Sequence, residues 1–125
     1  MAAVYHEGFI YCFGGINYTD KVMKKCERLS LLVDEDKWQK IAEMRECRKN
    51  ASACSVTADT IYVFGGSSNS VQALDTIEQY SVAANRWNTI SVTMPIGLCF
   101  LTTFKLTPTK ILILGGSRKE QPNSH

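Results

Sequence analysis

Only two histidines and three prolines occur among the 125 residues, and the five cysteines form no Cys-x-x-Cys pair. His6 and His125 are too few for a histidine-rich copper or zinc centre, and the odd cysteine count argues against a disulfide framework. The longest apolar runs have the length of a strand, well below the ~20 residues of a membrane-spanning helix. These shortages argue against a disulfide-rich secreted scaffold, a zinc domain and a helical membrane protein.

Charge of one sign is also scarce, because 14 Lys and Arg residues are nearly balanced by 12 Asp and Glu residues, giving a net charge of +2. So small an excess favours neither nucleic acid nor an anionic membrane as a partner. The chain contains neither of the phosphate-binding motifs GxGxxG and GxxxxGK[ST]. The acidic run Asp34-Glu35-Asp36 lacks the glycine and the ligand spacing of a calcium loop and is typical of a hairpin turn. We therefore expect no cofactor and no metal.

The first residues, Met1 to Glu7, show no basic segment followed by an apolar one, so the sequence predicts no signal peptide. Cysteines such as Cys12 and Cys54 lie within apolar strand patterns, where cysteine acts as a small hydrophobic residue. This usage is typical of a reducing compartment. We expect a cytoplasmic protein, with the nucleus as the alternative.

What the chain does contain is a long internal repeat. Three apolar runs each end in a glycine pair, namely Gly14-Gly15, Gly65-Gly66 and Gly115-Gly116. The pairs recur at intervals of about 50 residues, a period that indicates one supersecondary unit copied along the chain. Stacked units of this kind build extended binding surfaces.

Each unit is predicted to consist of four short antiparallel strands. Two apolar runs joined by a turn precede each glycine pair and predict a β-hairpin. A third strand and a fourth strand that opens on tryptophan follow the first two pairs. The predicted strands are 2–5, 9–13, 26–32 and 38–41, then 51–57, 60–64, 76–82 and 87–90, and finally 99–106 and 110–114. Because no helical period persists, the fold class is all-β.

The repeat divides the chain into two complete four-stranded units, 2–46 and 47–96, a half unit, 97–116, and a polar tail, 117–125, that we expect to be disordered. The repeated residues have structural roles. Glycine accepts the positive φ of a sharp strand-to-loop turn. Trp38 and Trp87 are expected to bury their rings against a neighbouring sheet, and Tyr62 to anchor its polar tip at the rim.

These residues resemble the kelch repeat over nearly the whole chain, from Ala2 to Gly116. The second unit carries the family pattern in Ile61-Tyr62-Val63-Phe64-Gly65-Gly66, Trp87 and Met94, and the first adds Met44 and Arg48. The resemblance implies a β-propeller, typically of 4–8 blades. Two and a half blades do not close a ring, so we expect a segment of a longer propeller, a ring completed by self-association with other chains, or a truncated product.

In kelch proteins the loops after Gly-Gly and those before the innermost strand line one mouth of the channel. The resemblance therefore implies that Arg48 binds an acidic protein or peptide through its planar guanidinium. Short polar and aromatic side chains in the loops suit the same contact. The other candidate partner-binding residues are Asn17, Tyr18, Ser67, Ser68 and Asn69.

The leading hypothesis is a non-enzymatic protein-binding module. Its resemblance to the commonest kelch architecture implies substrate recognition for a cullin-based ubiquitin ligase, with the cullin machinery bound through a BTB domain outside these residues. Two alternatives remain open. One is a cytoskeletal scaffold that binds actin. The other is a fragment of a propeller enzyme whose catalytic residues lie in other blades.

Overall fold

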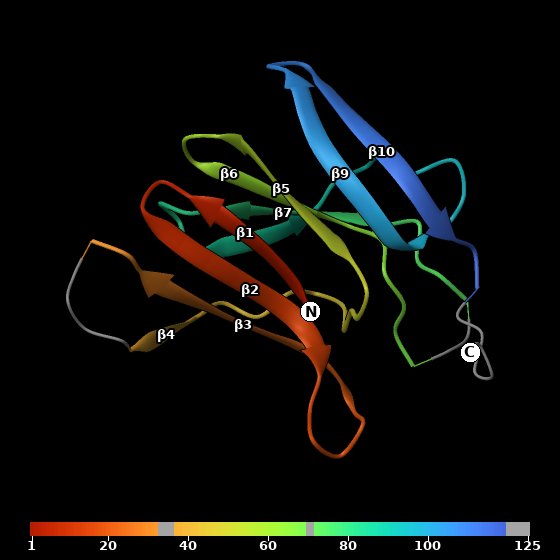
Figure 1. Ribbon diagram of the computed structural model, residues 1–125, viewed down its shortest axis with the longest axis horizontal. Coiled ribbons are helices and arrows are strands. Elements are labelled where there is room, and N and C mark those ends of the chain that lie inside the picture. Colours follow the sequence, from red (N-terminus) through yellow and green to blue (C-terminus); the bar gives the residue numbers. More distant parts are fainter. Residues whose placement is uncertain (33–36, 70–71, 120–125) are drawn as a thin grey trace.

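The computed structural model describes residues 1–32, 37–69 and 72–119. Within these ranges the chain forms ten strands in three antiparallel sheets that stand side by side (Figure 1). No helix there is long and apolar enough to cross a membrane. The acidic turn 34–36 and residues 120–125 of the expected tail lie outside the described residues.

Each sheet is built from strands that are consecutive in sequence, so within a sheet each strand pairs with the one before it. We call the sheets blade 1, blade 2 and the half blade. Blade 1 contains β1 (Ala2–His6), β2 (Phe9–Ile16), β3 (Val22–Ser30) and β4 (Trp38–Ile41). Blade 2 contains β5 (Ser52–Thr57), β6 (Thr60–Phe64), β7 (Ile77–Ser81) and β8 (Arg86–Thr89). The half blade contains β9 (Cys99–Thr107) and β10 (Lys110–Ser117). The predicted all-β architecture is confirmed.

The tail starts later than the sequence predicts. Ser117 is still part of β10, and Lys119 forms a β-bridge with Gln72 of the loop after β6. The backbone N–H of Ala73 donates to the carbonyl of Arg118 at 3.1 Å. These backbone pairs hold the segment 117–119 against the loop of blade 2 that follows β6. The polar composition of the segment gives no sign of them.

Blades 1 and 2 pack through an aromatic core that the two-residue period of the strands places between them. Phe13 of β2 meets Trp87 of β8 edge-on, with ring centroids 5.3 Å apart. Tyr11 lies beside Tyr80, with centroids 6.1 Å apart. The indole N–H of Trp87 also donates to the carbonyl of Ala42 at 2.8 Å. Trp87 therefore has the inter-blade role predicted for it.

Trp38 does not have that role, and its predicted burial is wrong. Its side chain is 45% exposed, whereas that of Trp87 is 5% exposed. The physical reason is the missing neighbour. Trp87 lies on the face of blade 2 that packs on blade 1, and no described sheet packs on the equivalent face of blade 1, which carries Trp38. Burial of the repeated tryptophan depends on a preceding blade.

His6 adds a polar link between the blades, and it ends β1 rather than lying in the turn after it. Its ring is buried, and Nε2 lies 2.8 Å from the carbonyl of Ala58. Because a carbonyl only accepts, Nε2 carries the proton and Nδ1 accepts from the Ser55 hydroxyl at 2.7 Å. The histidine is fully used in joining β1 to the β5–β6 hairpin.

The glycine pairs occupy the conformation that the repeat predicts. Gly65 has a φ of 60°, and a Cβ added there would collide with the carbonyl oxygen of Leu98. Its neighbour Gly66 donates its N–H to that same carbonyl at 2.8 Å. The positive φ and the close approach of the Leu98 carbonyl together require glycine at this corner.

We expect Gly65→Ala to lower the free energy of unfolding by about 3–5 kcal/mol, because the left-handed conformation and the collision both oppose a side chain. Gly115→Ala is the matched control. Gly115 has a φ of 67°, but an added Cβ would meet nothing within 4 Å, so only the conformational cost of about 1–2 kcal/mol applies. Urea denaturation measures both values, and equal losses would contradict the role of the Leu98 carbonyl.

Candidate functional site

Arg48 lies in the connector between blade 1 and blade 2, and its side chain is completely buried. All five of its N–H groups have acceptors, which come from the end of β6, the start of β7 and Glu46. Nε donates to Glu78 at 2.9 Å, Nη1 to the carbonyls of Gly65 and Thr76 at 2.7 and 3.0 Å, and Nη2 to Glu46 and the Thr76 hydroxyl at 3.0 and 2.8 Å. The prediction that Arg48 grips an acidic peptide is therefore wrong.

Glu78 is the partner that sequence reasoning missed. Its side chain is buried, and it accepts from the backbone N–H groups of Arg45 and Glu46 as well as from Arg48. One carboxylate thus binds the connector by both its backbone and its arginine. The available signal was a charged residue beside Ile77 and near Tyr80, in a strand that also carries the inward-facing core positions.

We expect Arg48→Ala to lower the free energy of unfolding by about 3–5 kcal/mol, because it leaves the buried carboxylate of Glu78 without its ion-pair partner. Arg86→Ala, which removes an exposed arginine from β8, should change it by no more than about 0.5 kcal/mol. The double variant Arg48→Ala/Glu78→Ala should lose less than the two single variants summed. Additive losses in urea denaturation would show that the pair is not coupled.

The other candidate binding residues fall into two loops that follow the glycine pairs at the same end of the sheets, the lower end in Figure 1. Asn17 shapes its own turn, because its side-chain oxygen accepts from Thr19 N–H and Lys21 N–H at 2.9 and 3.0 Å. Tyr18 is 99% exposed. In the second loop Ser67 is buried and pairs through its backbone with Lys49, Ser68 is half-buried, and Asn69 is exposed. The exposed residues Tyr18 and Asn69 remain predictions, whereas burial of Ser67 argues against direct contact.

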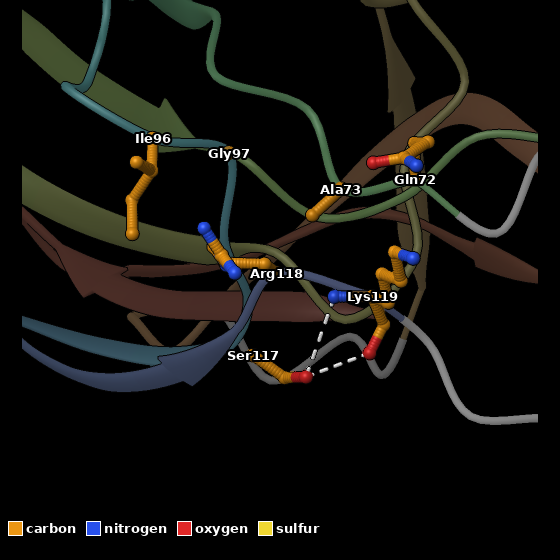
Figure 2. A pocket seen from close by; sticks show the side chains of 7 residues that line it. All are labelled: Gln72, Ala73, Ile96, Gly97, Ser117, Arg118 and Lys119. Carbon is orange, nitrogen blue, oxygen red and sulfur yellow. Dashed lines mark hydrogen bonds between the residues drawn. The ribbon is translucent and has the colours of Figure 1, made fainter.

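A cleft of about 640 Å³ opens at this end, where blade 2 meets the half blade (Figure 2). Three segments form it: the loop after β6, the connector before β9 and the end of β10. The described lining residues are Gln72, Ala73, Ile96, Gly97, Ser117, Arg118 and Lys119. Its volume lies within the range of small-molecule sites. The sequence pattern did not indicate this cleft, because residues 117–119 read as a disordered tail.

Two cations, Arg118 and Lys119, stand among the described lining residues of the cleft. Arg118 and Lys119 form no ion pair with any residue in the described ranges, and the described lining contains no carboxylate. The turn that carries them is fixed by Ser117, whose hydroxyl donates to the Lys119 carbonyl at 2.6 Å (Figure 2). Two positive charges with hydroxyl and amide groups beside them favour a small anion with hydroxyl groups.

Burial makes three of the thiols poorer nucleophiles. Burial raises the pKa of Cys26 to about 12, and burial also raises the pKa values of Cys12 and Cys54. A thiol with so high a pKa remains protonated near neutral pH and is a poor nucleophile. Within the described ranges no three His, Cys, Asp or Glu side chains gather to form a metal site.

Cys26 should also make the protein less stable in alkali. The folded state holds the thiol proton more tightly than the unfolded chain, where the pKa is about 8.5. The stabilisation is complete below that value and is lost as pH rises toward about 12. We expect the free energy of unfolding to fall over this window, and to fall less steeply in Cys26→Ala, as measured by urea denaturation at each pH. An identical slope in the variant would exclude Cys26 as a cause.

Comparison with known proteins places these features in a family. The family model described as N-acetylneuraminate epimerase matches residues 23–125. The N-acetylneuraminate epimerase of Vibrio cholerae is 28% identical over 88 residues, covering 66% of this chain and 23% of that protein. The enzyme of the same name from Salmonella typhi is 29% identical over 94 residues, covering 71% and 24%. The chain therefore spans about a quarter of the length of these relatives.

A solved structure titled "Structure of YjhT" superimposes on 94% of this chain and 33% of its own, with a TM-score of 0.79 and 20% sequence identity. The predicted fragment of a kelch-type propeller is confirmed. The predicted non-enzymatic module and ubiquitin-ligase adaptor are wrong, because the matching family and relatives are named as epimerases. Nothing in these matches supports actin binding, and the third hypothesis, a fragment of a propeller enzyme, agrees with them better.

Proposed function

The chain belongs to the N-acetylneuraminate epimerase family, and from this membership we propose that it forms part of a propeller enzyme that binds an acidic sugar and inverts one of its stereocentres. The cleft between blade 2 and the half blade is the binding site in this proposal. The observation that carries it is the pair of cations, Arg118 and Lys119, beside polar groups in a cavity of suitable size.

The chemistry of N-acetylneuraminate matches the lining. The sugar carries one carboxylate, several hydroxyls and an N-acetyl group. A guanidinium and an ammonium suit the carboxylate, because charge-assisted hydrogen bonds to an ionised acceptor are the strong ones. Ser117, whose hydroxyl proton is donated to the Lys119 carbonyl, can still accept from a sugar hydroxyl, and Ile96 offers apolar contact for the acetyl methyl group.

Binding and proton transfer are separate tasks in this proposal. Inverting a stereocentre requires a group that moves a proton, and carboxylates and imidazoles do this most often. The described lining has neither, and His6 is committed between the blades. We therefore assign substrate binding to Arg118 and Lys119, and assign the acid–base step to other parts of the whole enzyme.

We expect N-acetylneuraminate to bind the full chain, and Arg118→Ala to weaken binding about tenfold or more, because a hydrogen bond to a charged group contributes about 1.5–3 kcal/mol. Lys119→Ala should weaken it similarly. Titration followed by protein NMR measures the dissociation constants, with Arg86→Ala as the matched control at an exposed arginine of β8.

N-acetylglucosamine, which lacks the carboxylate, serves as the ligand control and should bind at least tenfold more weakly. Equal binding of the two sugars, or full affinity in Arg118→Ala, would contradict the proposed site. The sugar's own NMR spectrum, followed for exchange between its epimers, reports separately whether the chain has activity by itself.

A further inference from the structure

The turn at the end of β10 lines one side of the cleft, and its three carbonyls are all engaged (Figure 2). The Ser117 carbonyl accepts from the buried Cys99 thiol at 3.4 Å, and the Arg118 carbonyl accepts from the Ala73 N–H at 3.1 Å. The Lys119 carbonyl accepts from the Ser117 hydroxyl at 2.6 Å. The backbone of the turn is therefore held at three successive residues.

The Ser117 hydroxyl has one hydrogen-bonding position left, and that position only accepts. A hydroxyl has one proton and two lone pairs. The proton is donated to the Lys119 carbonyl, and the Lys119 N–H approaches one lone pair at 3.4 Å. Because Ser117 lines the cleft and is half-buried, the other lone pair can accept from a ligand that brings its own O–H group.

The other side chains of the cleft do not offer such an acceptor. The two cations can only donate, and Ala73, Ile96 and Gly97 carry no polar side-chain atom. Apart from the Gln72 amide, Ser117 therefore has the only side-chain oxygen among the described lining residues.

The glycine corner does not by itself require a serine at this place. The residue after the glycine pair is Ile16 in blade 1, Ser67 in blade 2 and Ser117 in the half blade. Ser67 is 0% exposed and pairs through its backbone with Lys49 and Ala73. Ser117 is half-buried and is followed directly by two cations, a combination that the other two corners lack.

We infer that Ser117 is a specificity-determining residue of the cleft, where it accepts a hydrogen bond from a ligand hydroxyl beside the carboxylate. The inference rests on the proposed function, because Arg118 and Lys119 define where the carboxylate lies. Since Ser117 directly precedes Arg118 in the chain, a ligand that satisfies both carries its hydroxyl close to its carboxylate. The ligand class is therefore a 2-hydroxy carboxylate.

N-acetylneuraminate belongs to this class, because a hydroxyl stands on the carbon that bears its carboxylate. Its O–H would extend a chain of hydrogen bonds through the Ser117 hydroxyl to the Lys119 carbonyl. Successive hydrogen bonds in such a chain polarise and strengthen one another. A ligand that lacks the hydroxyl keeps the contacts with the cations and loses this chain.

The test compares N-acetylneuraminate with its 2-deoxy derivative, in which hydrogen replaces that hydroxyl, by NMR titration of the full chain. We expect the wild-type chain to bind the 2-deoxy sugar about three- to tenfold more weakly, the range for one neutral hydrogen bond. Ser117→Ala should bind the two sugars equally. Ser117→Thr, which keeps the hydroxyl, should retain the preference, and Ser91→Ala, at an exposed serine of the connector before β9, should leave it unchanged.

The comparison of two sugars separates recognition from support of the turn. If Ser117 only anchors the turn, Ser117→Ala weakens both sugars by the same factor and the preference survives, which would overturn the inference. Equal binding of the two sugars by the wild-type chain would also overturn it, but would leave the proposed function intact as long as Arg118→Ala weakens both. A wild-type chain that binds neither sugar would overturn the proposed function, and this inference with it.

Discussion

The buried ion pair between Arg48 and Glu78 is the constraint around which the two complete blades are arranged. Both side chains are fully enclosed, and removing two charges from water is costly unless every donor and acceptor finds a partner. The structure meets that condition: the guanidinium uses all five N–H groups, and the carboxylate also accepts from the backbone of Arg45 and Glu46. Because these partners come from the connector and from two segments of blade 2, the end of β6 and the start of β7, the pair fixes where blade 1 ends relative to the sheet that follows.

Apolar packing then completes what the ion pair positions. Trp87 lies against Phe13 and Tyr80, and its N–H reaches the Ala42 carbonyl, so one residue joins the core of both blades to the connector. Trp38 is the same residue type at the same point of its own blade, and it is half exposed. The contrast shows that a blade of this repeat does not bury its own hydrophobic face. Its neighbour does so, and stability is therefore a property of pairs of blades.

The strand pattern, the glycine corners and the inter-blade role of Trp87 could be predicted because each is encoded locally, by alternation, by turn chemistry and by the repeat. The errors about individual residues concern contacts between distant segments. The spacing between Met44 and Arg48 places the arginine before β5, but only the fold brings Glu78 to it from 30 residues away. The cleft depends on pairing of Ala73 with Arg118, which no local pattern reveals. Burial of Trp38 depends on a sheet that the described residues do not include.

Arg48 and Arg118 show why residue type alone does not identify a binding residue. Both are arginines next to a loop, and both could bind a carboxylate. Every N–H group of the Arg48 guanidinium already has an acceptor, so a ligand could bind it only by breaking these hydrogen bonds. The buried carboxylate of Glu78 would then lose its ion-pair partner. Arg118 is held through its backbone carbonyl, and its side chain lines an open cleft without an acidic neighbour among the described lining residues. When the backbone is held in place and the charged side chain stays in solvent, a ligand can bind without first ordering the backbone or breaking internal contacts of that side chain.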